Sequence, residues 1–288
     1  MTPEVPSEAA PLESLKIEKG RGLAGLPWWL FALVLISVWV GFVIYLDSDY
    51  REAFTFIKSG IRLTITISLS AYAVALVIGL LAGLGRISSN VVINNVATFY
   101  VEFVRGIPML VLIFFVALVG VPIVVEGLNA LGVWIEGLGL GPIAEPLVAL
   151  QNQSVPMTLR AMIALAVTYG AFLAEIFRAG IQSIERGQME AARSLGMSYA
   201  QAMRYVILPQ AIRNVLPALG NDFVAMVKDS SLVSVLAVRD ITQIARLYAG
   251  RTFRFREAYV TLSVMYLTMT IILSFLVRLL ERRLRRHA

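Results

Sequence analysis

The chain has 288 residues, of which 58% are hydrophobic and only 15% are charged. Soluble domains contain about 25% charged residues, so this composition argues against a soluble globular domain and favours a membrane protein. The basic residues responsible for the net charge of +6 lie mostly near the ends of apolar runs, which is typical of membrane flanks and not of a nucleic-acid groove. The absence of cysteine excludes disulfides and thiolate metal sites.

Catalytic and nucleotide-binding motifs are missing from the sequence. The dipeptide Gly-Lys never occurs, which excludes the phosphate-binding loop G-x-x-x-x-G-K-[ST]. We therefore expect no cofactor in this chain, and any ATP used must be bound by another chain. A membrane enzyme is disfavoured, because the single histidine, His287, is next to last in the chain and no other catalytic motif stands out.

In chain order, residues 1–27 come first; they are rich in Pro and Glu and contain no apolar run, which predicts a flexible tail. A helix needs about 20 mainly apolar residues to cross a bilayer. Four runs meet this condition, so we expect transmembrane helices over residues 28–46, 63–85, 106–125 and 258–277.

Two further runs are apolar but contain charges. Residues 159–181 include Glu175 and Arg178, which are three positions apart and therefore on one helix face. Residues 212–238 include Pro217 and several charges, which predicts a bent or broken helix lining a cavity. The alternative is a soluble amphipathic segment. With these two runs the prediction is an all-α membrane protein of about six transmembrane helices.

The distribution of Lys and Arg predicts the orientation. Six spans place both termini on one side, and basic residues flank both ends of the chain. Residues 120–158 contain no Lys or Arg, so the positive-inside rule places this Gly/Pro-rich loop outside and both termini in the cytoplasm. Alternation then places residues 182–209 in the cytoplasm. Residues 239–256 contradict the rule, because they hold five arginines and should face outward.

Residues 187–209 predict a polar helical hairpin between two spans. Gly187 and Gly196 bracket a short helix, with Glu190 in its first turn and Gly196 as its C-cap. Ser198 can cap a second helix, which Leu208 and Pro209 should end. That second helix has one apolar face, formed by Tyr199, Ala202, Met203, Val206 and Ile207. The hairpin could bind a partner or could simply connect two spans.

The run EAARSLG, followed by nine residues and VILP, resembles the EAA signature of ATP-binding-cassette importer permeases. The matching residues are Glu190, Ala191, Ala192, Gly196, Leu208 and Pro209, while Val206 replaces the usual isoleucine. EFVRGIPMLV (102–111), LPQAIRNVLPALGN (208–221) and KDSSL (228–232) look like the polar-amino-acid branch, which includes histidine, glutamine and arginine permeases. The resemblance covers residues 57–285.

Two parts of the chain depart from that branch, which typically has five spans. Residues 28–56 look like an extra first transmembrane helix with a short external loop, preceded by the 1–27 tail. The loop 121–158 looks longer than usual.

The resemblance implies a type I ABC importer permease in a bacterial inner membrane. Its partners would be a cytoplasmic ABC ATPase subunit that binds ATP and Mg, a second permease subunit, and a periplasmic amino-acid-binding protein. The region 182–209 would be the ATPase-coupling region, with Gly187 and the matched EAA residues at its centre.

For the amino acid substrate we expect a path along the charged, broken span. A zwitterion needs partners for both of its charges in a setting of low dielectric constant. The candidate residues are Asn221, Asp222, Lys228, Asp229, Ser230 and Ser231. Alternatively these residues form structural ion pairs with other charges in the spans, namely Glu102, Arg105, Glu175 and Arg178.

A secondary transporter or channel that works without ATP is the alternative function. Intramembrane charges and a broken helix fit it equally well. It gives no role to the EAA run, and the sequence shows no internal repeat to support it.

Overall fold

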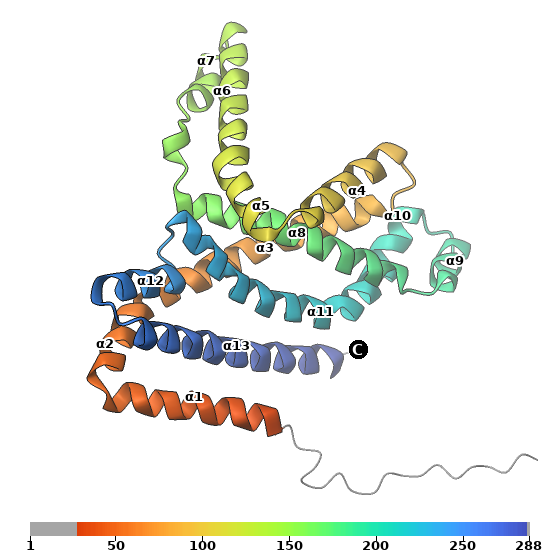
Figure 1. The fold of residues 1–288 in the computed structure, drawn as a ribbon. Coiled ribbons are helices and arrows are strands. Elements are labelled where there is room, and N and C mark those ends of the chain that lie inside the picture. Colours follow the sequence, from red (N-terminus) through yellow and green to blue (C-terminus); the bar gives the residue numbers. More distant parts are fainter. Residues whose placement is uncertain (1–27, 287–288) are drawn as a thin grey trace, which may run out of the picture.

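The structure is a computed structural model that describes residues 28–286, so the predicted tail 1–27 and His287 lie outside the described residues. The described part consists of helices (Figure 1). The first half comprises α1 (Trp28–Leu46), α2 (Ser48–Ile57), α3 (Ile61–Arg86), α4 (Val91–Gly106), α5 (Met109–Phe115), α6 (Val121–Gly137) and α7 (Gly141–Val148). The second half comprises α8 (Met157–Gln182), α9 (Arg186–Ser194), α10 (Tyr199–Ala202), α11 (Leu208–Asp229), α12 (Ile241–Thr252) and α13 (Phe255–Arg286).

Short segments of other helix types join several of these helices. A 3-10 turn, Lys58–Gly60, connects α2 to α3, and another, Asn152–Ser154, precedes α8. A π turn, Val116–Gly120, joins α5 to α6, and a second, Met203–Ile207, joins α10 to α11. The 3-10 segment Ser230–Leu236 continues from α11.

Helices α3 and α8 form the centre of the molecule and approach each other closely at small residues. A Cβ atom added at Gly79 would lie only 2.6 Å from the Cβ of Leu173, and one at Gly170 would lie 2.7 Å from Ile78. Close approach at glycine is how membrane helices gain van der Waals contact where lipid supplies no hydrophobic driving force. The core around this contact is buried and rich in alanine, including Ala71, Ala75, Ala161 and Ala164.

Four helical stretches are long and apolar enough to cross a membrane: Ser48–Arg86, Met109–Gly137, Met157–Gln182 and Phe255–Glu281. The predicted spans 63–85, 159–181 and 258–277 fall within three of them, and the run 28–46 coincides with α1. The all-α prediction is therefore confirmed. Helix α11 does not meet the same criterion, in line with the charges that set the run 212–238 apart.

The predicted span 106–125 is displaced, and the sequence missed α4 altogether. The chain is extended at Ile107 (φ −106°, ψ 136°), because a residue that precedes proline avoids the α conformation. A new helix then starts after Pro108 and runs through the π turn to Gly137. The expected external loop 121–158 is thus largely helical, as α6 and α7, and Figure 1 shows these two helices projecting from the bundle.

The sequence predicted that Pro209 ends the second helix of the hairpin, and this prediction is wrong. Helix α10 runs on through the π turn Met203–Ile207 into α11, with Pro209 in the first turn of α11. Because proline has no N–H and crowds the carbonyl four residues earlier, the wider π turn allows the helix to continue. Pro217 lies inside α11, which continues as an α-helix from Leu208 to Asp229.

Two opposite ends of the bundle carry different elements. The hairpin α9–α10, the end of α13 and the start of α1 lie at one end, while α2 and α12 lie at the other (Figure 1). At that second end Arg254 forms ion pairs with Asp49 (3.0 Å) and Glu52 (2.8 Å) of the α2 region. Arg256 also pairs with Glu257 at 3.1 Å, so two of the arginines that contradicted the charge rule are paired with acidic residues.

Candidate functional site

The polar hairpin is held by specific caps. Gly196 adopts φ +84°, a conformation that glycine accepts without strain, and it ends α9. The Ser198 side chain accepts a hydrogen bond from the backbone of Gln201, and the Gln201 side chain accepts one from the backbone of Ser198, which forms a capping box. Because α9 begins at Arg186, Glu190 lies in its second turn, not in the first as expected from the sequence.

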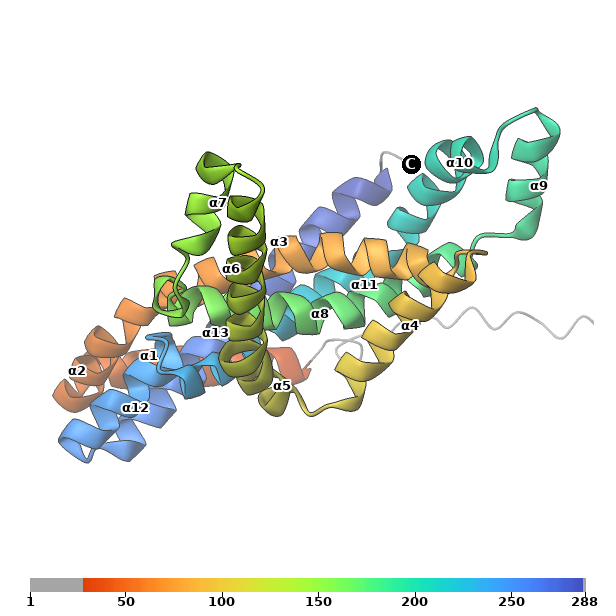
Figure 2. The same cartoon turned by 90° about the horizontal axis from the view of Figure 1, so that it is seen from above.

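One side of the hairpin packs on the bundle and the other faces outward. Ala192 (4% exposed) turns inward, and the base of the hairpin rests on a buried cluster of Ile181, Ile207 and Ala211. Glu190 and Ala191 are exposed, and Leu195 beside them is 82% exposed. Figure 2 shows α9 standing at the edge of the molecule. A short rigid helix with an exposed small-residue face is thus presented away from the membrane bundle.

The remaining coupling candidates occupy different places. Gly187 is exposed in the first turn of α9, and a Cβ there would meet nothing within 4 Å. Leu208 and Pro209 lie at the start of α11, where Leu208 packs against the cluster under the hairpin.

The six substrate-path candidates lie on α11 and at the start of the 3-10 segment that follows it, and they differ in burial. Asp222 and Asp229 are seven residues apart, on one face, and are partly buried. Ser230 is buried and donates to the Val227 carbonyl at 2.8 Å, while Ser231 is partly buried. Asn221 and Lys228 are exposed and point away from that face.

Two tyrosines from other helices join the acidic face of α11. The Tyr169 hydroxyl donates to Asp229 Oδ2 at 2.7 Å. Asp222 interacts electrostatically with both Asp229 and Tyr72, and Tyr72 itself donates to the Leu219 carbonyl at 2.5 Å. Sequence reasoning missed both tyrosines, since they lie more than 50 residues from their partners and within apolar runs.

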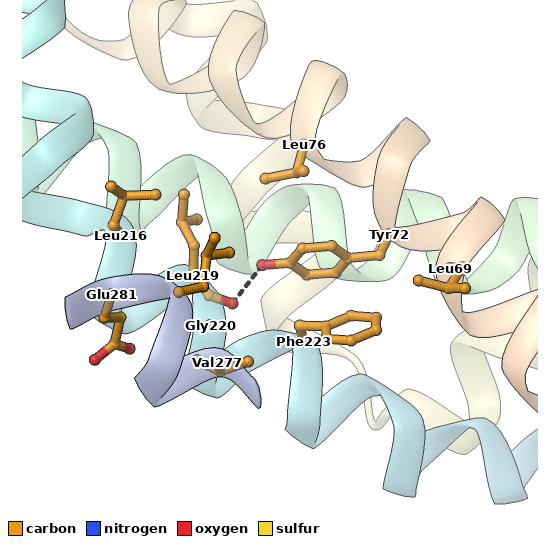
Figure 3. Close-up of a pocket in the computed structure, with 10 residues that line it drawn as sticks. Leu69, Tyr72, Leu76, Leu216, Leu219, Gly220, Phe223, Val277 and Glu281 are labelled. Carbon is orange, nitrogen blue, oxygen red and sulfur yellow. Dashed lines mark hydrogen bonds between the residues drawn. The ribbon is translucent and has the colours of Figure 1, made fainter. Parts of the chain in front are cut away.

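A cavity of about 310 Å³ adjoins this region between α3, α11 and α13. Figure 3 shows Tyr72 and Phe223 side by side within it, with Glu281 at its far end. Its other walls are leucine and valine side chains. A Cβ at Gly220 would lie 2.2 Å from Val277, so this glycine allows α11 to approach α13 beside the cavity.

The charges of α4 and α8 form a separate cluster around Glu175. Its carboxylate accepts from Arg178 (2.8 Å) and Arg105 (3.1 Å) and also pairs with Arg86. Arg86 in turn pairs with Glu102 at 3.0 Å. Glu102, Arg105, Glu175 and Arg178, which the sequence suggested as intramembrane ion-pair residues, are thus all found in ion pairs, with one another or with Arg86. Among the side chains that the structure describes, no ion pair connects this cluster to Lys228 or Asp229.

Arg86 is the member of this cluster that the sequence did not single out. It is the last residue of α3, directly after the predicted span 63–85. Basic residues are common at membrane flanks, so nothing in the sequence indicated that Arg86 joins α3, α4 and α8.

Comparison with known proteins agrees with this geometry. The sequence model described as "Binding-protein-dependent transport system inner membrane component" matches residues 75–286. The "Probable glutamine ABC transporter permease protein GlnM" of Bacillus subtilis (strain 168) is 38% identical over 233 residues, which cover 81% of this chain and 95% of that protein. The "Glutamine transport system permease protein GlnP" of Escherichia coli (strain K12) is 34% identical, covering 78% and 91%.

Solved structures give the same result. A chain of "Crystal structure of an amino acid ABC transporter with histidines" is 37% identical, with a TM-score of 0.63 over 80% of this chain and 94% of that one. A chain of the MetNI methionine ABC transporter, at 20% identity and a TM-score of 0.56, shares the fold. The chain therefore belongs to the family of binding-protein-dependent transport system inner membrane components.

Proposed function

We propose that this chain is the membrane subunit of an ATP-driven amino acid importer and that α9 couples it to a separate ATPase subunit. The observation that carries the proposal is the outward face of α9, formed by Glu190 and Ala191 within the EAA run. Small side chains allow a partner surface to approach closely, and Glu190 offers a charge for a basic residue there. ATP and Mg would be bound by that partner.

The packing under the hairpin supports a mechanical role. Ile181 from the end of α8 and Ala211 from the start of α11 share one buried cluster with Ile207. A displacement of α9 therefore acts on α8 and α11 together, because close-packed side chains transmit strain. These two helices carry Glu175, Asp222 and Asp229, so a motion of the hairpin would shift the charges inside the bundle.

The proposed topology places the hairpin and both termini in the cytoplasm of a bacterial cell, with the chain in the inner membrane. The support is that α9, the end of α13 and the start of α1 lie at the same end of the bundle (Figure 1). An external binding protein would then meet the end that carries α2 and α12, and a second permease subunit would complete the pore.

The acidic face of α11 is our candidate for contact with the amino acid. Asp222 and Asp229, with Tyr72 and Tyr169 beside them, offer oxygen acceptors for an ammonium group. An ammonium group within the membrane requires such partners. Relatives named for glutamine and amino acid transport support this substrate class.

Charge reversal on α9 tests the coupling. Glu190→Lys should lower ATP-dependent amino acid uptake in proteoliposomes at least about tenfold, since placing like charges together at an interface costs several kcal/mol. Gly196→Pro should do the same, because proline cannot adopt φ +84°. Uptake is measured with the partner ATPase and binding protein present, after membrane insertion of each variant has been verified.

Glu136→Lys is the matched control, since it makes the same charge change at an exposed position on α6. It should leave uptake unchanged. Normal uptake by both hairpin variants would refute the coupling role of α9, and uptake that needs no ATPase subunit would favour a channel or secondary transporter.

A further inference from the structure

A second, larger cavity of about 790 Å³ lies between α1, α2 and α13, away from the acidic face of α11. Its size is within the range of about 300–1,000 Å³ that is usual for ligand sites. One wall is formed by Arg51, Phe54 and Thr55 of α2 and by Lys58, the first residue of the 3-10 turn after it; their spacing of i, i+3, i+4, i+7 places them on one side. The opposite walls, from α1 and α13, are mainly apolar and include the hydroxyl groups of Ser37, Tyr45 and Thr268.

Helix α1 packs loosely against the bundle and leaves this space unfilled. Of its described side chains only Val40 is buried, whereas Leu35 and Trp39 are about two-thirds exposed. At Gly41, which lines the cavity, an added Cβ would meet nothing within 4 Å. Within a bilayer, the apolar material available to fill a mainly apolar space between helices is lipid.

Two cations, Arg51 and Lys58, lie on this wall of the cavity. The Arg51 guanidinium lies 5.5 Å from the centre of the Tyr45 ring and donates to the Tyr45 carbonyl, and Lys58 Nζ lies 5.9 Å from the centre of the Phe54 ring. Neither forms an ion pair with any side chain that the structure describes.

The acids nearest to these cations in the chain are engaged elsewhere. Asp49 and Glu52 pair with Arg254. The Asp47 carboxylate accepts from the backbone of Asp49 at 2.8 Å as the N-cap of α2. The cavity therefore combines apolar walls with uncompensated positive charge on one side.

We propose that this cavity binds an anionic phospholipid, with one acyl chain between α1 and α13 and the phosphate group between Arg51 and Lys58. Long basic side chains reach headgroups while their stems stay among apolar groups. Basic pockets between membrane helices suit anionic headgroups, and each cation contributes about 1 kcal/mol. The site is independent of the transport role proposed above, and it explains how α1 stays attached to the bundle with so few contacts of its own.

Native mass spectrometry of the full, delipidated chain in detergent tests the proposal. Phosphatidylglycerol and phosphatidylcholine with identical acyl chains are added together, and we expect preferential retention of one phosphatidylglycerol. Lys58→Gln and Arg51→Gln should each weaken its binding about fivefold. Arg62→Gln, at an exposed cation that does not line the cavity, is the matched control and should bind as the native chain does.

A second variant tests the apolar part. Gly41→Leu places a branched side chain inside the cavity and should weaken retention of the lipid even though both cations remain, whereas Gly137→Leu, in equally open space on α6, should not. If Gly41→Leu fails to fold, the two cation variants decide alone.

Three results would overturn the proposal. The first is equal retention of both lipids by the native chain, or retention of neither. The second is undiminished binding by a folded Gly41→Leu variant. The third is displacement of the lipid by inorganic phosphate, which would show a site for the headgroup alone.

Discussion

At the scale of single residues, the contact between α3 and α8 depends on positions where no side chain fits. We predict that Gly79→Ala destabilises the protein by about 1–3 kcal/mol, because its methyl group would lie 2.6 Å from the Cβ of Leu173 and force these helices apart. The loss should appear as a lower unfolding temperature in detergent.

Gly127→Ala provides the comparison for that experiment. Gly127 also lies inside a helix, yet an added Cβ there meets nothing within 4 Å. Alanine favours helix by about 1 kcal/mol over glycine, so this variant should be at least as stable as the native protein. Equal stability of the two alanine variants would show that the α3–α8 contact does not require glycine.

At the scale of elements, α12 begins at a buried acid. Asp240 is fully buried as the N-cap of α12 and accepts from the Gln243 backbone at 2.8 Å. Burial raises the pKa of Asp240 to about 6, while hydrogen bonds from Gln243 and Thr242 oppose the shift. Tyr266 of α13 faces the same place and forms a hydrogen bond with Thr242 at 2.9 Å.

This raised pKa predicts how stability depends on pH. The unfolded chain has the ordinary carboxyl pKa of about 4, so the folded protein binds the proton more tightly. The contribution of Asp240 is full below about pH 4, is lost as pH rises to about 6 and stays lost above, with a total of up to about 3 kcal/mol. Asp240→Asn, which keeps the cap but cannot ionise, should lack this decline when thermal unfolding is compared at pH 4.5 and pH 7.

The elements that the sequence revealed are those with a local signal. The capping residues Gly196 and Ser198 are local, and so are the apolar runs that became α1, α3, α8 and α13. Helix α4 was missed because its 16 residues hold polar Asn and Glu among apolar ones and form no run of spanning length. The sequence also failed at Pro209, where a π turn allowed a helix to continue.

The parts of the candidate site that depend on distant contacts could not be read from the sequence. Arg86 and Glu175 are 89 positions apart, and Tyr169 and Asp229 are 60 apart. Which charge faces which depends on how α3, α8 and α11 cross, and that crossing is set by close packing at glycines rather than by a periodic pattern. The residue types were therefore predictable, whereas their partners were not.

At the scale of the whole molecule, α1 and α2 differ in how firmly they belong to the bundle. The family match begins at residue 75, and α1 buries Val40 alone among its described side chains. Helix α2, in contrast, places Ala53 and Ile57 in a fully buried cluster with Ile241 of α12 and residues of α13. The boundary of the unit that folds by itself should therefore fall between α1 and α2.

Two truncations test this boundary. Deletion of residues 1–46 should leave a folded protein with amino acid uptake within about twofold of the native chain, because α1 buries only one of its described side chains, Val40, and so gains little packing with the bundle. Deletion of residues 1–60 also removes Ala53 and Ile57, exposes the faces of α12 and α13 that pack on them, and should prevent accumulation in the membrane. Membrane yield, unfolding temperature and uptake are compared for both. Loss of folding in the shorter deletion would mean that α1, through its own contacts or through bound lipid, is an integral part of the bundle.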